Sequence, residues 1–450
     1  MSSPHPTTVS FSTLNGLSVR LPRRQSERPA GQSVGGFEPK PQSTTEFSKK
    51  APIVALCHLS WDWVWQRPQQ FLSRLAKTHP VLFVETYRAE VERTTVRLNS
   101  AAGHPNVTLC QIHLPTSRWS EGKFIDRERR RALQGVMAKE LHGQFDDAIL
   151  WFNDPMAVTA FAGHLDEALI VYDCMDELSQ FKGAPPALLE REHELLEVAD
   201  VVFCGGRKMR DKRIKINPNS HFFGTGVDCR HFGSALSPKL AVADELASLQ
   251  GPVLGYFGVI DERIDYDLLA ALADANPHWH VVMVGPTAKV DPAHFPQRSN
   301  LHWMGGRPYS DLPALTKGFS VCLMPFALNE ATEYINPTKA LEYMAAGRPV
   351  VSTALDEVKS NFGGVARIAQ SHQEFIELCL KEASAPSDGR VARGLRLAME
   401  NTWDAIAGKM EAHIAEAVSA RWETDAAFEN AAVKAQTTLS PLVGNQSAYV

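Results

Sequence analysis

The sequence predicts an α/β protein that contains two domains, each with a parallel sheet. Its 450 residues exceed what one hydrophobic core usually supports. Short β-branched or apolar segments alternate with helical patterns, and this alternation is typical of βα units. Because the alternation occurs once in each half of the chain, we expect two Rossmann-like domains.

The expected strands locate the two domains. In the first half they are 52–57, 81–85, 107–112, 148–152, 169–173 and 201–204. In the second half they are 253–258, 280–285, 301–305, 321–326, 349–353 and 366–369. Strand character disappears between Asp228 and Gly251, where Ser and Pro appear, so we place the linker near 235–250. The first domain is expected over 50–235 and the second over 250–402.

The two ends of the chain are predicted to lie outside these domains. Residues 1–48 are rich in Ser, Thr, Pro, Gly and Gln, so we expect a disordered leader that buries too little apolar surface to fold. Residues 403–425 have apolar side chains near the helical period and are predicted to form a helix that packs back toward the first domain. Residues 426–450 are expected to be a disordered tail.

Composition excludes several classes of protein. A formal net charge of -5 gives no general attraction to nucleic acid, so no nucleic-acid partner is expected. The seven cysteines are scattered without a CxxC pair, which indicates reduced thiols rather than disulfides or a zinc site. The sequence contains neither an apolar stretch of bilayer length nor the apolar core of a signal peptide, so we expect a cytoplasmic protein.

The segment NPTKALEYMAAGRPVVST has the clearest local chemistry. Asn336 is predicted as the N-cap of a helix over 337–346, with Pro337 in its first turn and Gly347 in the left-handed conformation after its end. Ligands of parallel sheets bind beyond the carboxyl ends of strands, where the start of a helix attracts phosphate. The segment therefore predicts a diphosphate site.

Two charged side chains of this helix are candidates for that site. Lys339 lies in the first turn and adds a positive charge, while Glu342 lies one turn beyond Thr338 and is placed to accept hydrogen bonds from ribose hydroxyls. The alternative is that both are ordinary solvent-exposed helix residues. The glycine run that ends at Gly258 is a poor match to a dinucleotide-binding fingerprint.

Polar and aromatic side chains follow the strands of the first half. Trp61, Trp63 and Trp65 alternate after the first strand, and their rings either stack on a sugar or pack in the core. Asp62 and Arg67 in the same segment are candidates for the acceptor side because polar groups among aromatic ones need partners.

Further along this half, carboxylates follow two more strands. Asp173 and Asp176 come at the end of one strand, where they converge on a ligand or cap the next helix. Asn153 and Asp154 follow the strand before it.

Four segments carry a family resemblance. NPTKALEYMAAGRPVV resembles the donor-binding segment of retaining GT-B glycosyltransferases, especially glycosyltransferase family four. Residues 58–76 are similar to the start of a bacterial branch that acts on cell-surface polysaccharides, 225–232 to the segment before the interdomain linker, and 255–269 to the first donor-domain strand and loop. The resemblance spans about 50–420 and implies two domains that face a cleft, with the acceptor on the first and a nucleotide sugar on the second.

The resemblance also implies roles for individual residues. Glu342 matches the glutamate that binds ribose, whereas the position of the family's first glutamate, which contacts the donor sugar, falls on Tyr334. The family holds the diphosphate with an Arg and a Lys in the loop after the first donor-domain strand, the loop that contains Gly258. Only Arg263 matches, and the Arg position falls on Val259, so we expect Lys339 to supply the missing cation. The alternative for Arg263 is a surface salt bridge. Asn153 occupies the position of a family histidine, and Asp154 matches the acidic residue after it.

Together these observations predict a glycosyltransferase that moves a sugar from a nucleotide diphosphate donor to a saccharide or lipid-linked acceptor. No cofactor is expected, because the nucleotide sugar is a substrate. The resemblance implies retaining transfer without a metal, in cell-surface polysaccharide or glycolipid synthesis. The alternatives are a nucleotide-sugar epimerase of the same fold, an inactive sugar-binding or scaffold protein, and an NAD-dependent oxidoreductase, which the poor glycine fingerprint disfavours.

Two basic clusters suggest a peripheral position at the inner face of a membrane. An anionic surface attracts each nearby basic residue by roughly 1 kcal/mol. The alternative is that both clusters are solvated helix faces. The clusters are Arg127, Arg129, Arg130 and Arg131, and Arg207, Lys208, Arg210, Lys212, Arg213 and Lys215.

Overall fold

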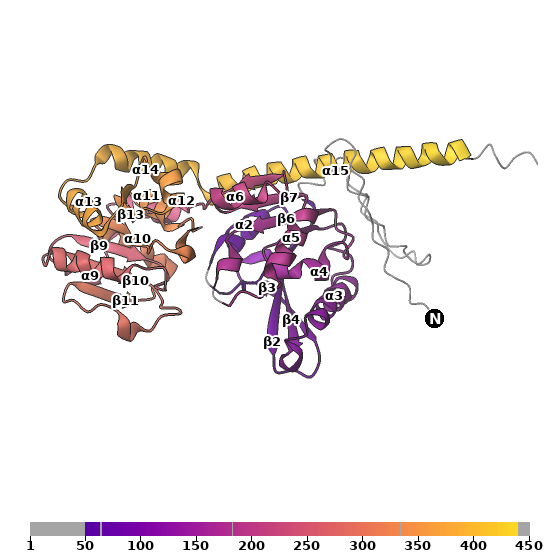
Figure 1. Ribbon diagram of the computed structural model, residues 1–450, viewed down its shortest axis with the longest axis horizontal. Coiled ribbons are helices and arrows are strands. Elements are labelled where there is room, and N and C mark those ends of the chain that lie inside the picture. Colours follow the sequence, from indigo (N-terminus) through magenta and orange to yellow (C-terminus); the bar gives the residue numbers. More distant parts are fainter. Residues whose placement is uncertain (1–49, 64, 182, 334, 440–450) are drawn as a thin grey trace, which may run out of the picture. The chain divides into compact units, whose positions relative to one another are not determined.

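The computed structural model describes residues 50–63, 65–181, 183–333 and 335–439, with side chains up to residue 424. The leader predicted over 1–48, the end of the chain after 439 and Tyr334 lie outside the described residues. Of the described residues, those up to Val418 form one compact unit that contains two sheets, and Ser419–Leu439 belong to a second unit. Helices lie against both sheets (Figure 1).

The N-terminal sheet has eight strands in the order β3-β4-β2-β1-β5-β6-β7-β8. Only β3 runs antiparallel to its neighbour, and the other pairs are parallel. The chain places β2 on one side of β1 and β5 on the other, so the strand order reverses between β1 and β5. The strands are β1 (Ile53–Leu56), β2 (Val81–Ala89), β3 (Thr95–Ala101), β4 (His104–Pro115), β5 (Ile149–Phe152), β6 (Leu169–Cys174), β7 (Val201–Cys204) and β8 (Ser220–Phe222).

The C-terminal sheet has six parallel strands in the order β11-β10-β9-β12-β13-β14. Its order reverses between β9 and β12. Ligands of open α/β sheets bind outside the carboxyl ends of strands at such reversals, so each sheet marks one edge as a candidate site. The strands are β9 (Val253–Phe257), β10 (His280–Val284), β11 (Leu301–Gly305), β12 (Val321–Met324), β13 (Val350–Thr353) and β14 (Arg367–Ala369).

The helices follow the strands in alternation, as βα units require. Those of the first half are α2 (Arg67–Leu75), α3 (Gly122–Lys139), α4 (Val158–Phe161), α5 (Leu188–Val198), α6 (Arg207–Arg213), α7 (Cys229–Gly233) and α8 (Asp244–Ala247). Those of the second half are α9 (Tyr266–Ala275), α10 (Leu312–Gly318), α11 (Lys339–Ala345), α12 (Asp356–Phe362), α13 (His372–Ser384), α14 (Asp388–Glu400) and α15 (Trp403–Leu439).

The start of α15 packs on the N-terminal sheet domain. The Trp403 ring meets the Phe71 ring edge-on at 5.2 Å, and Asp404 forms ion pairs with Arg74 and Lys77. Trp403 is buried, so this end of the helix is fixed mainly by apolar contact. The helix continues to Leu439, beyond the expected end at 425, because Ala-rich sequence favours helix even where it lacks an apolar face.

The predicted α/β fold with two parallel-sheet domains is confirmed, and each expected strand is present. Two strands were not expected from the sequence. β3 is largely exposed and contains Arg, Asn and Ser, so it lacks the apolar pattern of a buried strand. β8 has three residues, too few for a pattern.

The cysteines occupy the core rather than the surface. Their side chains are buried, except for Cys229, which is half-buried. Burial raises the pKa of the Cys57 and Cys110 thiols to about 12, so these groups remain protonated at neutral pH. They act as small apolar side chains. The buried six are Cys57, Cys110, Cys174, Cys204, Cys322 and Cys379.

Candidate active site

A polar network lies at the carboxyl ends of β1, β5 and β6, beside the strand-order reversal of the N-terminal sheet. Asn153 follows β5, is 1% exposed, and donates through Nδ2 to the backbone oxygen and to Oδ2 of Asp173. His58 follows β1 and is exposed, and its Nδ1 lies 3.1 Å from the Asn153 carbonyl oxygen. The carbonyl therefore orients the ring and leaves Nε2 at the surface.

Arg67 and Asp173 form a buried ion pair in this network. Arg67 Nε donates to Asp173 Oδ1 at 2.9 Å, and the Asp173 side chain is fully buried. Arg67 Nη1 also donates to the carbonyl oxygens of Phe223 and Gly224. Both side chains were expected to contact an acceptor, but these bonds already engage them, so their role here is to join β6 to the segment after β8.

The two other predicted carboxylates of this domain have different environments. Asp154 was predicted as the acidic residue of the site, but its carboxylate accepts from the backbone N–H of Met156 and pairs with the buried Arg129, so it caps a turn. Asp176 has no hydrogen bond to its carboxylate from the residues described. Burial raises the pKa of Asp176, and the positive charges of Arg263, His58 and Arg67 oppose this shift. Of Asp154 and Asp176, Asp176 is thus the one whose carboxylate remains available to bind a ligand.

The tryptophans after β1 divide into core and surface. Trp61 is 3% exposed and meets Phe83 edge-on, while its backbone N–H donates to Glu85 Oε1. Trp63 is 71% exposed, and Trp65 stacks on His104. Asp62 is also exposed. Trp61 therefore anchors the segment, whereas Asp62, Trp63 and part of the Trp65 side chain face solvent.

In the C-terminal sheet, Lys339 lies at the reversal between β9 and β12. Its Nζ is 5.3 Å from the ring of Tyr256, which lies in β9, and 5.4 Å from the ring of Phe326, which follows β12. It has no hydrogen bond to a residue that the structure describes. Burial lowers the pKa of Lys339 to about 8, while Glu342 opposes this shift. A desolvated cation without a partner is a candidate for binding an anionic ligand.

Glu342 lies one helical turn after Lys339 on α11. Burial raises the pKa of Glu342 to about 7, and the charge of Lys339 opposes the shift. The carboxylate makes neither an ion pair with Lys339 nor a hydrogen bond within the described part of the chain. The predicted spacing thus brings together two partly desolvated, opposite charges whose hydrogen-bonding capacity is unused.

Arg263 is held by its own loop. Its guanidinium makes a two-pronged contact with the Asp261 carboxylate, in which Nη2 lies 2.6 Å from Oδ2. The loop is further fixed by a hydrogen bond from Ala327 N to the Arg263 carbonyl oxygen. Arg263 is also near enough to Lys339 to lower the pKa of that lysine. The loop after β9 therefore brings a second cation to the Lys339 site, with part of its charge offset by Asp261.

Gly258 allows this loop to pass close to Lys339. Its φ of +144° is a conformation that side chains rarely adopt. A Cβ there would lie 2.8 Å from Lys339 Cε and 2.9 Å from the Tyr256 hydroxyl oxygen. The absence of a side chain is therefore a geometric requirement of the site.

We expect Gly258→Ala to lower stability by about 1–3 kcal/mol through backbone strain and to weaken nucleotide binding by displacing Lys339. Thermal unfolding and calorimetric titration measure the two effects. Gly364→Ala is the matched control, because a Cβ there meets nothing within 4 Å. Equal melting temperature and affinity in the two variants would contradict the role given to Gly258.

The start of α11 differs from the expected one. The helix begins at Lys339 with Thr338 as its N-cap, and no side chain caps it. The prediction of Asn336 as N-cap is wrong because its Nδ2 instead donates to the carbonyl oxygen of Gly205, which follows β7. The helix ends as expected, with Gly347 at φ +68°. The side chain of Thr338 makes no cap bond and lies half-buried.

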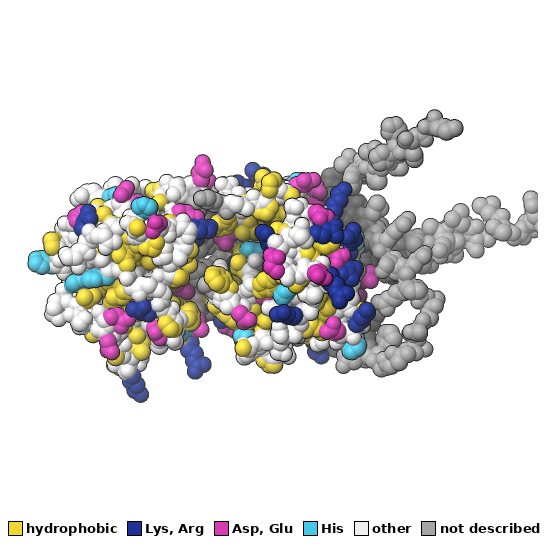
Figure 2. All heavy atoms as spheres, turned by 90° about the horizontal axis from the view of Figure 1, so that it is seen from below, with side chains coloured by type: hydrophobic (Ala, Val, Ile, Leu, Met, Phe, Trp, Pro, Cys, Tyr) yellow, Lys and Arg dark blue, Asp and Glu magenta, His cyan; other side chains and the backbone are white. Residues whose placement is uncertain are grey.

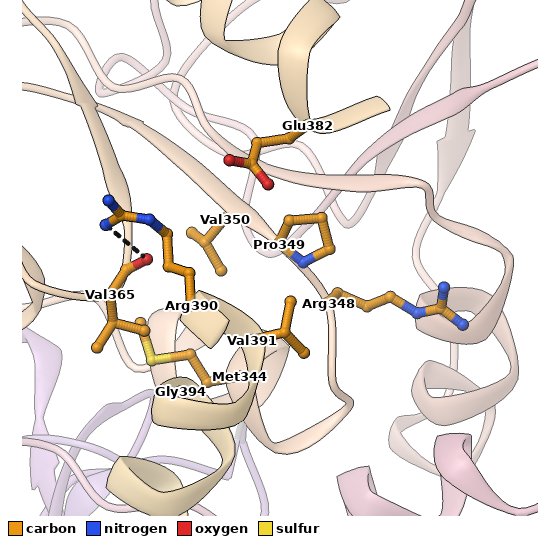
Figure 3. A pocket seen from close by; sticks show the side chains of 9 residues that line it. All are labelled: Met344, Arg348, Pro349, Val350, Val365, Glu382, Arg390, Val391 and Gly394. Carbon is orange, nitrogen blue, oxygen red and sulfur yellow. Dashed lines mark hydrogen bonds between the residues drawn. The ribbon is translucent and has the colours of Figure 1, made fainter. Parts of the chain in front are cut away.

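A separate hollow in the C-terminal sheet domain does not bind a sugar-sized ligand. Figure 3 shows that Met344 of α11, Glu382 of α13 and Arg390 of α14 line it, and that Arg390 reaches the Val365 carbonyl oxygen. Its volume of about 10 Å³ holds a single water molecule. The unpaired charges of Lys339 and Glu342 therefore mark the better candidate.

Two residues of the candidate site, His58 and Tyr309, were not predicted from the sequence. His58 was not singled out, although a polar residue directly after a buried strand is the signal that identified Asn153. Tyr309 was also missed; burial raises its pKa, and the negative charge of Glu342 adds to the shift. No local pattern links Tyr309 to Glu342, because their proximity depends on the tertiary fold.

Most members of the two basic clusters have partners within the fold. Arg129 is buried against Asp154, and Arg213 is buried against Glu177 and Glu192. Lys208 pairs with Glu333 and Asp356. Figure 2 shows Asp and Glu side chains among the Lys and Arg side chains on the face that it draws. Over the described residues, no helix combines the length and apolar character of a membrane span.

The second sheet matches a known family. Residues 251–381 match the family model described as "Glycosyl transferases group 1". This segment contains Gly258, Arg263, Lys339 and Glu342. The predicted resemblance to GT-B glycosyltransferases is thereby confirmed.

A curated relative and several solved structures extend the similarity beyond the group 1 domain. The chain is 25% identical over 205 residues to TuaH of Bacillus subtilis (strain 168), provisionally described as a teichuronic acid biosynthesis glycosyltransferase. The match covers 41% of this chain and 50% of the relative, so the chain spans about half the length of that protein.

The solved structures include sucrose-phosphate synthase from Thermosynechococcus elongatus, with a TM-score of 0.62, 13% identity, and coverage of 82% of this chain and 100% of that chain. They also include Anabaena HepE in complex with UDP and glucose, with a TM-score of 0.58, 14% identity, and coverage of 82% and 99%. At these identities the likeness shows the fold, which is GT-B.

Proposed function

We propose that this chain transfers a sugar from a nucleoside diphosphate donor to a saccharide or lipid-linked acceptor in the synthesis of a cell-surface polysaccharide. The observation that carries the proposal is the pair Lys339 and Glu342, two partly desolvated charges at the strand-order reversal of a group 1 glycosyl transferase domain. Their complementary chemistry suits a diphosphate and a ribose.

The proposed roles follow from the chemistry of the donor, whose diphosphate is negatively charged and whose ribose offers hydroxyl groups. Lys339 and Arg263 bind the diphosphate, and Glu342 accepts hydrogen bonds from the ribose hydroxyls. Gly258 lets the loop backbone approach the phosphates. We also propose that Tyr334, which the resemblance places beside the donor sugar, contacts that sugar. Asn336 and Thr338 are proposed to bind the donor from the segment before α11.

The proposed reaction breaks the bond between the sugar and the diphosphate while an acceptor hydroxyl bonds to the same carbon. Negative charge grows on the departing diphosphate, and fixed cations stabilise that charge most in the transition state. The acceptor proton passes to a phosphate oxygen of the leaving group. Retention of configuration and independence of metal belong to the proposal on the strength of the family resemblance alone.

The acceptor is proposed to bind at the carboxyl ends of the N-terminal strands. Asp176 and the exposed His58 are the available polar groups there, and Asp62 and Trp63 face solvent in the neighbouring segment. TuaH is described as acting in teichuronic acid biosynthesis, and this supports a polysaccharide acceptor that is anionic. The cytoplasmic location, with a peripheral position at the inner membrane face, is also part of the proposal.

We expect Glu342→Ala to weaken nucleoside diphosphate binding by about 1.5–3 kcal/mol, the contribution of a hydrogen bond to a charged group. Calorimetric titration with UDP, the nucleotide bound in the HepE structure, and with other nucleoside diphosphates measures it. Glu400→Ala, an exposed glutamate on α14, is the control. Unchanged affinity for every nucleotide in Glu342→Ala would exclude a ribose contact.

Product analysis separates the proposed transferase from the alternatives. Nucleotide sugars that stabilise the chain in a thermal-shift screen are incubated with and without candidate acceptors, and the products are identified by mass spectrometry. A transferase yields a glycosylated acceptor. A sugar converted in the absence of acceptor indicates an epimerase, and binding without any product indicates a sugar-binding protein.

A further inference from the structure

A polar hollow lies beside α6 and β8, at the edge of the N-terminal sheet. Its volume is about 380 Å³, and it is lined by Arg207, Arg210, Asp211, Ser220, His221 and Phe222. A volume of this order accommodates a group much larger than a water molecule. Two arginines and one acid make the lining positive on balance.

Arg207 is positioned by groups without charge. Its guanidinium lies 4.3 Å above the Phe222 ring, and its Nε donates to Asn361 Oδ1 at 2.9 Å. Its two terminal nitrogens have no hydrogen bond to any residue that the structure describes. Because neither contact neutralises the guanidinium, Arg207 presents the N–H groups of two terminal nitrogens and a full positive charge.

Arg210 and His221 complete the lining. Arg210 Nη1 donates to Asp211 Oδ1 at 3.0 Å, and its other N–H groups are left for a ligand. The Arg210 side chain is 41% exposed, so solvent weakens this ion pair. His221 bonds Asn219 through Nε2 and stacks on His413 of α15 at 3.8 Å, and His413 in turn contacts Glu416. The acids near the hollow include Asp211, Glu416 through His413, and Glu357, which accepts from Asn361 and from the Lys208 N–H.

The hollow is connected to the donor segment through side-chain amides. Asn361, which holds Arg207, donates to Asn336 Oδ1 at 3.4 Å, and Asn336 donates to the Gly205 carbonyl oxygen. Asn336 precedes α11, which bears Lys339 and Glu342. A ligand bound by Arg207 is thus near the segment that leads to the donor site.

We propose that this hollow binds the phosphate or diphosphate group of an anionic ligand through the terminal nitrogens of Arg207 and Arg210, beside the ring of His221. Paired guanidinium groups suit phosphate oxygens because each offers a planar pair of donors. That the ligand is the acceptor rests on the proposed function, whereas the binding itself does not. A phosphate-bearing lipid and a water-soluble phosphate present the same chemistry.

The test uses the full chain and inorganic pyrophosphate, without donor or turnover. The side-chain signals of His221 and His413 are assigned by single His→Gln substitutions and followed by NMR during the titration. We expect a saturable shift of the His221 signal, with affinity at least tenfold weaker in Arg207→Gln/Arg210→Gln. Arg127→Gln, an exposed arginine on α3, is the control and should match the wild type.

A His221 signal that pyrophosphate does not move, or that moves with equal affinity in the double variant, overturns the proposal. Pyrophosphate that binds only at the Lys339 site gives this negative result, since that site leaves His221 unaffected. Co-sedimentation with phosphatidic acid vesicles then identifies the source. Binding that the double substitution abolishes indicates a lipid phosphate, and pyrophosphate binding without vesicle binding indicates a soluble phosphate. The local NMR readout remains valid even if sugar transfer is never observed.

Discussion

Replacing Lys339 by glutamine should reduce turnover by about 100- to 1,000-fold, the range found when one group that stabilises transition-state charge is removed. Donor affinity should fall much less, because the charge that the lysine meets grows as the diphosphate departs. The fold should be unaffected, since a desolvated cation is removed from between two aromatic rings. Steady-state kinetics and thermal unfolding measure these effects.

The pH profile gives an independent check on Lys339. Its pKa is lowered to about 8, so the ammonium is charged below that pH and neutral above it. The kcat/KM of the wild type should therefore fall as pH rises through about 8, and Lys339→Gln should lack this step. Lys381→Gln, an exposed lysine on α13, should retain both the rate and the profile of the wild type. Wild-type turnover in Lys339→Gln would remove the lysine from the reaction.

Breaking the Arg67–Asp173 pair should cost about 3–5 kcal/mol of stability, the usual cost of leaving one buried charge without its partner. Arg67→Met removes the contacts to Asp173 and to the Phe223 and Gly224 carbonyl oxygens. Urea unfolding followed by circular dichroism measures the loss. The double variant Arg67→Met/Asp173→Asn should recover part of it, because the uncompensated carboxylate is gone.

An exposed arginine provides the comparison for Arg67. Arg97→Gln on β3 should change stability by less than about 0.5 kcal/mol. A loss of similarly small size in Arg67→Met, together with impaired acceptor binding, would favour the original expectation that Arg67 contacts the acceptor. The two roles are thus separable by stability and binding.

The sequence was most informative where the chemistry is local. Lys339 and Glu342 share a helical turn, so their spacing was enough to place both charges together. The buried strands were equally clear, because Val201–Cys204 and Val321–Met324 have compact apolar or β-branched character that depends on no distant partner. Gly347 was predicted because a helix end imposes a backbone conformation that glycine favours.

Tertiary contacts decided the rest. Asn336 has the composition of an N-cap, but its amide bonds a carbonyl oxygen 131 positions away in sequence, and local propensity gives no sign of this competitor. Arg67 looked available because Asp173 is distant in sequence. Asp154 was expected as an acidic residue of the site, and its bonds to Met156 and Arg129 became apparent only in the fold. Such choices depend on pairings that one sequence does not contain.

The buried thiols make the chain suitable for site-specific labelling. A maleimide reagent needs an accessible thiolate, which the buried cysteines do not offer, and burial also raises the pKa of the half-buried Cys229. Substitution of Cys229 alone would therefore give a background with little reactivity toward such reagents. A cysteine introduced at the exposed Trp63 could then carry a single fluorophore beside the proposed acceptor region and report ligand binding as a change in emission.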